Sequence, residues 1–380
     1  MIKCLNQMKS SPQKKKLPRL IIAAAIAIIV FSVSMAVIDS RLLSTTYHYS
    51  PVSVATSSVP LRPSLDILDY NRRMIALAGY GTTTAETGII ATSSAWLATS
   101  SSISSPLHRW PVPTVYPLGG AILPFSRIVA YYGNFYSAQM GILGQYPLDE
   151  VANKLTHVVN EWQAADPNTP VIPGIDYIAV VAQGSPGADG KYILRMPDSE
   201  IEKAIAMAHS MAGLVFLDIQ PGLSNLETEV PLLDKYLQMP EVELAIDPEF
   251  SMKNGVRPGR QIGTMDARDV NYAAEHLAKL VQAYNLPPKI LLVHRFTEEM
   301  ITNYEYIKPL PEVQIVMNMD GWSSPLKKIK TYNTVITPEP VQFAGIKLFY
   351  KNDALPPSPG LLTPKQVLSL HPAPIFIEYQ

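Results

Sequence analysis

The sequence predicts a (β/α)₈ TIM-type barrel over residues 126–380, preceded by a segment of different character. From about residue 126, short apolar runs alternate with amphipathic stretches, and eight such runs fit in the last two thirds of the 380 residues. Eight strands that alternate with helices over about 250 residues are typical of this barrel. An open doubly wound sheet is the alternative, but no Gly-rich phosphate turn follows the first run, so its nucleotide-binding form is not supported.

The apolar runs are mostly continuous, which is typical of strands buried on both faces. They lie near residues 127–133, 175–183, 212–220, 242–247, 289–296, 313–321, 341–350 and 373–380. Helices are expected between most of them. The clearest is "DARDVNYAAEHLAKLVQAYN", with Asp266 as its N-cap and "LPP" at its end. Others are "DSEIEKAIAMAHSMAG", with Asp198 or Ser199 as cap, "PLDEVANKLTHVVNEW" and "TPKQVLSL", and two weaker segments are "TEEMITNYEYI" and "SSPLKKIKTY".

The N-terminus predicts export. Residues 1–19 carry only basic charges, and residues 20–38 carry none. This length suits a transmembrane signal anchor, and the upstream cations favour a cytoplasmic N-terminus. The alternative is a cleaved signal peptide with "SMA" at 34–36 as the cleavage site. Either interpretation places the chain after Asp39 outside the cytoplasm, as a single-pass cell-membrane protein or a secreted one.

Residues 39–125 are rich in Ser, Thr and Pro, which predicts a low-complexity stalk or linker. One segment, "SLDILDYNRRMIALAGYG", has helical spacing and is expected to form a short helix within this tether. The single cysteine, Cys4, precedes the apolar run, so no disulfide can stabilise the exported part. A formal net charge of -1 gives no basis for nucleic-acid binding.

Polar and aromatic side chains recur where the expected strands end, which is the functional face of such a barrel. The catalytic candidates among them are Glu249, Asp218, Asp320 and Asp247. The candidates for substrate binding are Tyr132, Asn134, Gln220, His294, Arg295, Trp322, Lys347 and Glu378. Aromatic rings can stack on sugars, and Arg, Asn and Gln can bind hydroxyl groups, so the expected partner is a polysaccharide or a cell-envelope glycan.

Glycosidic cleavage needs one protonated acid and one ionised carboxylate. We expect Glu249 as the general acid and Asp218 or Asp320 as nucleophile or base. Simpler roles stay open: Asp247 capping the turn at Pro248, Asp320 starting a turn, and Glu378 forming a salt bridge to Lys347. No cofactor or metal is expected, because only one of the seven histidines, His294, ends a strand and no HExxH motif occurs; an Asp-based Mg²⁺ or Ca²⁺ site stays open.

The segments "YYGNFYSAQMGILGQYP", "FLDIQPG", "LAIDPEF", "LLVHRF" and "NMDGW" resemble an uncharacterised family of exported bacterial proteins with a glycoside-hydrolase-like TIM barrel. The resemblance covers residues 126–380 and implies the barrel fold and an extracytoplasmic location. It implies no catalytic roles, because the chain lacks a signature such as DxxDxDxE. Three functions stay open: a glycoside-hydrolase-like enzyme acting on cell-envelope or external polysaccharide, a catalytically silent barrel that binds glycan or an envelope partner, and, as the third, a metal-dependent hydrolase.

Overall fold

The computed structural model describes residues 62–79 and 109–380. The expected basic segment, membrane anchor and most of the stalk lie outside these residues. Among the described residues, we find no helix with the length and apolar character that a membrane crossing requires.

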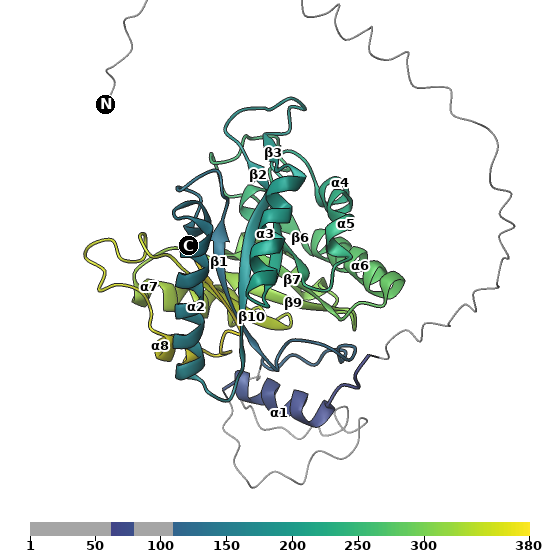
Figure 1. Ribbon diagram of the computed structural model, residues 1–380, viewed down its shortest axis with the longest axis vertical. Coiled ribbons are helices and arrows are strands. Elements are labelled where there is room, and N and C mark those ends of the chain that lie inside the picture. Colours follow the sequence, from purple (N-terminus) through teal and green to yellow (C-terminus); the bar gives the residue numbers. More distant parts are fainter. Residues whose placement is uncertain (1–61, 80–108) are drawn as a thin grey trace, which may run out of the picture. The chain divides into compact units, whose positions relative to one another are not determined.

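Eight parallel strands form a closed barrel, which confirms the predicted fold of the C-terminal region (Figure 1). Each strand pairs with the next around the ring, and the last pairs with the first. In chain order they are β1 (Arg127–Gly133), β2 (Val171–Ala182), β4 (Leu214–Ile219), β5 (Val242–Ile246), β7 (Lys289–Arg295), β9 (Val313–Met319), β10 (Phe343–Leu348) and β11 (Phe376–Tyr379).

The remaining strands lie outside this ring. The short β3 (Ile193–Arg195) pairs antiparallel with the far end of β2. The two-residue strands β6 (Met265–Asp266) and β8 (Ile301–Thr302) form a separate parallel pair. The segment "TEEMITNYEYI", which the sequence predicts as a weak helix, instead contains β8 and two 3₁₀ turns, η5 (Glu298–Met300) and η6 (Tyr304–Tyr306).

Helices cover the outside of the barrel (Figure 1). The longest, α2 (Leu148–Ala165) and α6 (Ala267–Tyr284), occur where the sequence predicts them, and Asp266 caps α6 in a capping box with Asp269. The predicted cap of α3 (Asp198–Ser210) is wrong, because the helix begins at Asp198 and follows Pro197 without a side-chain cap. The others are α4 (Leu226–Glu229), α5 (Asp234–Leu237), α7 (Pro325–Thr331), α8 (Pro364–Leu368), the 3₁₀ turns η2 (Ile142–Gly144), η3 (Val230–Leu233) and η4 (Pro248–Phe250), and the π-helical η7 (Tyr332–Ile336).

Apolar side chains fill two separate regions. An outer core lies between the strands and the surrounding helices. An inner cluster fills the ring itself, with one or two side chains from most strands: Ile128, Ala130, Leu214, Phe216, Ala245, Ile290, Leu292, Val316, Phe343 and Phe376. Side chains therefore fill the half of the barrel where the strands begin, as is usual for eight strands.

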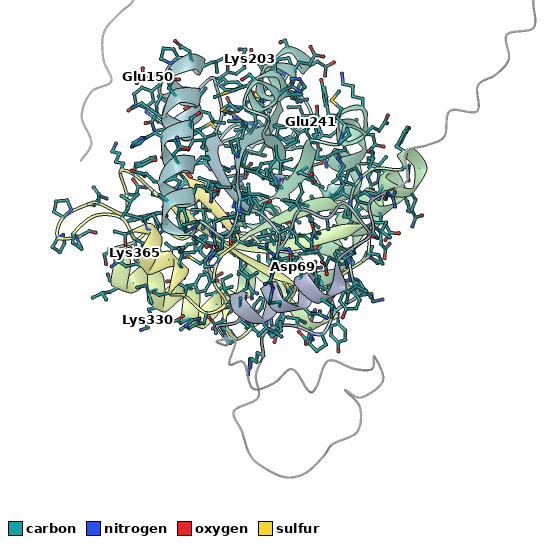
Figure 2. All side chains as sticks on the ribbon, turned by 60° about the horizontal axis from the view of Figure 1, so that its bottom comes forward. Asp69, Glu150, Lys203, Glu241, Lys330 and Lys365 are labelled. Carbon is teal, nitrogen blue, oxygen red and sulfur yellow. The ribbon has the colours of Figure 1, made fainter. Side chains whose placement is uncertain are left out.

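The helix expected in the stalk is α1 (Ile67–Leu77), and it packs against the barrel. Its buried Tyr70 and Met74 join the inner cluster beside residues at or next to the start of strands, such as Ile128 and Leu214. Figure 2 shows α1, marked by Asp69, at this end of the molecule. Helix α1 therefore covers the amino-terminal end of the ring and belongs to the same compact unit as the barrel.

Candidate functional site

A polar layer lies directly above the inner cluster. Side chains two positions apart on a strand point to the same face. Asp218, His294 and Glu378 each follow an inner-cluster residue (Phe216, Leu292 and Phe376) by two positions, so they also point into the ring. The same spacing applies to Tyr132, Asp247 and Asn318, and all six are buried. The functional face of the barrel is thus lined by polar groups from most of its strands.

One hydrogen-bonded chain links three strands across this layer. The Tyr132 hydroxyl donates to Asp218 Oδ2 at 3.1 Å and accepts from Gln220 Nε2, also at 3.1 Å. Gln220 Nε2 lies 3.4 Å from Asp247 Oδ2, and its Oε1 accepts from the backbone of Ala182 at 3.0 Å. These bonds hold two acids, from β4 and from the end of β5, at fixed positions in the ring.

The loop after β1 returns against Tyr132. Gly141 adopts φ +144°, and a Cβ there would lie 2.3 Å from the Tyr132 carbonyl oxygen, so only glycine fits. This close approach fixes the backbone of Tyr132 and hence the position of its hydroxyl group.

His294 lies among acids from three other strands. Its Nδ1 is 3.2 Å from Asp320 Oδ2 and 3.9 Å from Glu378 Oε2, and its Nε2 is 3.7 Å from Asp176 Oδ2. Glu378 Oε2 also accepts from Asn318 Nδ2 at 3.1 Å and pairs with Lys347 Nζ at 3.2 Å. The salt bridge between Glu378 and Lys347 that the sequence left open is therefore present.

Lys347 makes a second contact in the ring. Its Nζ lies 3.1 Å from the centre of the Tyr132 ring, which is a close cation–π contact. Burial lowers the pKa of Lys347, but Glu378 and the other carboxylates around it raise the pKa by more, so the net direction is upward. The ammonium group therefore stays charged inside the barrel.

Acids outnumber bases in this layer, and the pKa values reflect this. Burial raises the pKa of Asp176 and Asp247 well above the ordinary value, and it also raises the pKa of Asp218. Burial alone would lower the pKa of His294, but Glu378, Asp320 and Asp218 raise it to about 9. The layer thus contains carboxyl groups that resist ionisation beside an imidazole that favours its protonated form.

Glu249 lies at the edge of this layer, in the short 3₁₀ turn η4 that follows β5. The side chain of Asp247 accepts from the Glu249 backbone nitrogen at 3.0 Å, so Asp247 does cap this turn while also belonging to the polar layer. Glu249 is partly exposed. Burial and then the nearby charge of Asp320 raise the pKa of Glu249 to about 7, against the opposing effect of Lys347 and His294.

Three predicted substrate-binding residues lie elsewhere. Arg295 follows His294 on β7, so it points to the opposite face, where it contacts Glu339 and the carbonyls of Thr297 and Glu298. Asn134 holds a turn, with its Nδ2 donating to the carbonyl of Ile178 at 3.0 Å and its Oδ1 accepting from a backbone nitrogen.

Trp322 is the third of these residues. It is 59% exposed on the loop after β9, whereas the acids of the polar layer are buried. It can serve as a surface for a ligand at the barrel mouth, but it does not line the polar layer itself.

The site also contains Asp176, which the sequence does not mark as a candidate. It lies within the twelve-residue β2, opposite Tyr132 in the register with β1, and six more strand residues follow it. Asp176 is therefore not found when only the residues at strand ends are considered. The one available indication is a charged residue inside the apolar run "IDYIAVVA", where a solvent-facing role would be unexpected.

No protein-family model and no curated protein matches the chain. Solved structures with a similar fold are glycoside-hydrolase barrels. One is a cellulase, with 13% identity and a TM-score of 0.34 over 58% of this chain and 64% of that chain. The catalytic domain of alkaline cellulase K has 12% identity and a TM-score of 0.37 over 67% and 73%. A third is a tri-modular GH5 (subfamily 4) endo-beta-1,4-glucanase from Bacillus licheniformis, complexed with cellotetraose. It has 12% identity and a TM-score of 0.34 over 68% of this chain and 54% of that chain. Similarity this low does not bear on activity, which has to rest on the site.

Proposed function

We propose that this chain is a glycoside-hydrolase-like enzyme that cleaves cell-envelope or external polysaccharide with a pair of carboxyl groups. The observation that carries the proposal is Glu249, a partly exposed glutamic acid at the barrel mouth whose pKa is raised to about 7. A general acid must be protonated near its working pH, and burial beside a second carboxylate is how proteins reach that state.

Asp320 is the best partner for Glu249. It lies close enough to raise the pKa of Glu249, and its backbone nitrogen bonds to the carbonyl of Arg295 at 3.3 Å, which extends the β7–β9 ladder. Asp320 keeps 8% of its surface exposed, whereas Asp218 has none. We therefore assign the role of nucleophile or base to Asp320 in preference to Asp218.

The proposed location follows the charge pattern of the N-terminal region. Basic residues before position 20 and an uncharged run at 20–38 support a membrane anchor with the barrel outside the cytoplasm. In intact cells, added protease should then degrade the barrel. Protection of the barrel in intact cells, with digestion only after lysis, would contradict this location.

The catalytic test compares two variants on two kinds of substrate. Glu249→Gln should lower the hydrolysis of polysaccharide by about 10²–10⁴-fold. It should retain far more activity on dinitrophenyl glycosides, because that leaving group departs without a proton. Asp320→Asn should lose activity on both substrates. Glu305→Gln, an exposed acid outside the site, serves as the control. Undiminished polysaccharide hydrolysis by Glu249→Gln would remove this residue from the mechanism.

A catalytically silent barrel that binds glycan is the second candidate. It is favoured by the complete burial of Asp218 and Glu378, which bond to neighbouring side chains as a structural network would. It predicts that the unmodified protein binds glycan without turnover. It also predicts that Glu249→Gln binds as well as the unmodified protein, whereas Trp322→Ala binds more weakly.

A further inference from the structure

Three buried side chains of the polar layer take no part in the proposed pair of acids. They are Asp176 on β2, Asp218 on β4 and His294 on β7. Each offers a ligand atom, and these three atoms lie within 4.8 Å of one another. All three residues have no exposed surface. They therefore surround one point in the ring, although they come from segments far apart in the chain.

The same side chains have polar atoms without a hydrogen bond. Among the described residues, no hydrogen bond forms to either carboxyl oxygen of Asp176, to Asp218 Oδ1 or to His294 Nε2. A buried polar atom without a partner is rare and costly, and a buried carboxylate more so. Within the described part of the chain, Lys347 forms no ion pair with Asp176 or Asp218. Its ammonium group is instead paired with Glu378 and lies over the Tyr132 ring.

The orientation of His294 suits a metal ligand. Its Nδ1 faces Asp320 Oδ2 at 3.2 Å, while its Nε2 faces Asp176 Oδ2 at 3.7 Å. A histidine that binds a metal usually directs its other ring nitrogen at a carboxylate, which orients the ring and selects the tautomer. Asp320 is placed to do this, so Nε2 can exchange its proton for a metal ion on the side of Asp176 and Asp218.

We propose that Asp176, Asp218 and His294 bind one divalent transition-metal cation inside the barrel. One imidazole nitrogen and two carboxylates suit Zn²⁺ or Mn²⁺, whereas Mg²⁺ and Ca²⁺ favour sites made of oxygen alone. The sequence predicts no such site because the ligands share no local motif. The competing explanation is that protons shared within the layer neutralise these acids.

The first experiment uses the metals themselves as probes. The purified full chain is treated with chelator, and its melting temperature and bound metal are measured after addition of MnCl₂, ZnCl₂ or MgCl₂. We expect about one Mn²⁺ or Zn²⁺ per chain and a melting temperature that rises with its concentration, with no rise for MgCl₂. No uptake of either transition metal and no thermal shift would overturn the proposal in favour of shared protons.

Variants locate the site. Asp176→Asn and Asp218→Asn should each weaken metal binding at least about tenfold. Asp234→Asn is the matched control, because it disrupts a second His–Asp pair, with His276 at 2.6 Å, on the outside of the barrel. Asp234→Asn should bind metal as the unmodified protein does. Equal binding by the two buried variants would show that any bound metal lies elsewhere.

Stability separates loss of the site from loss of the fold. Without metal, Asp176→Asn should melt no lower than the unmodified protein, because a neutral amide of similar size replaces a buried carboxyl group that has no hydrogen bond. If Asp176→Asn does not fold, crystals of the unmodified protein soaked in MnCl₂ test the site instead. The expected result is an anomalous peak between Asp176, Asp218 and His294. Its absence would overturn the proposal. Metal binding is measured without a glycan, so failure of the hydrolase proposal would not affect this result.

Discussion

Replacing Glu249 by Gln should change the pH dependence of folding. In the folded protein, burial and Asp320 raise the pKa of Glu249 to about 7 from the ordinary 4.5, which the unfolded chain retains. Because the folded pKa is the higher one, protonated Glu249 favours the folded state. This contribution is fully present below about pH 4.5 and is lost as the pH rises through about 7.

The magnitude follows from these two pKa values. Each tenfold change in proton affinity is worth about 1.4 kcal/mol, so the loss amounts to about 3 kcal/mol. Glu249 keeps some contact with solvent, and screening reduces this to about 2 kcal/mol. Glutamine has no charge at either pH. Glu249→Gln should therefore gain about 2 kcal/mol of unfolding free energy relative to the unmodified protein between about pH 4.5 and pH 8.

Urea unfolding followed by tryptophan fluorescence measures this difference at the two pH values. The fully buried Trp162 becomes exposed on unfolding and reports the transition. Glu305→Gln should show no such gain, because its side chain is exposed. If the two curves for Glu249→Gln differ from those of the unmodified protein by the same amount at both pH values, the environment inferred for Glu249 is wrong.

Three other variants test the packing around the barrel and the binding of a ligand at its mouth. Met74→Ala should destabilise the protein by about 2–5 kcal/mol in urea unfolding if α1 closes the ring, while the 68% exposed Leu68→Ala should change stability by less than about 0.5 kcal/mol. Equal effects would mean that α1 is not packed. Lys328→Met should cost about 3–5 kcal/mol, because it leaves Asp353 buried without the cation 2.9 Å away; a smaller loss in thermal or urea unfolding would show that solvent reaches Asp353. Trp322→Ala should weaken polysaccharide binding in calorimetry without lowering the melting temperature, and unchanged affinity would place the glycan elsewhere.

The barrel could be predicted because continuous apolar runs mark strands buried on both faces, and eight of them close a ring. Several site residues could be predicted for a related reason: Asp218, His294 and Glu378 end such runs, and parallel strands end at the same edge. The structure brings these three together.

Other features depend on facts that no local pattern contains. Asp176 lies in the middle of β2 because that strand extends well beyond the ring edge, and its extent is set by the pairing with β1 and β4. Arg295 and His294 are neighbours in sequence, and only the phase of the strand decides which of them points inward. The spacing of apolar residues in α1 predicts a helix, but it does not predict which end of the barrel the helix covers.

Closure of the ring also determines when the site can exist. β11 pairs with both β1 and β10, and Arg127 Nε donates to the carbonyl of Pro374, 247 positions away. Glu378 on β11 reaches its partners only after this pairing, so a growing polypeptide on the ribosome has no assembled centre. Contacts between such distant segments form slowly, because a long loop must close before any of them is gained. The polar layer is thereby completed only when β11 has been inserted between β1 and β10.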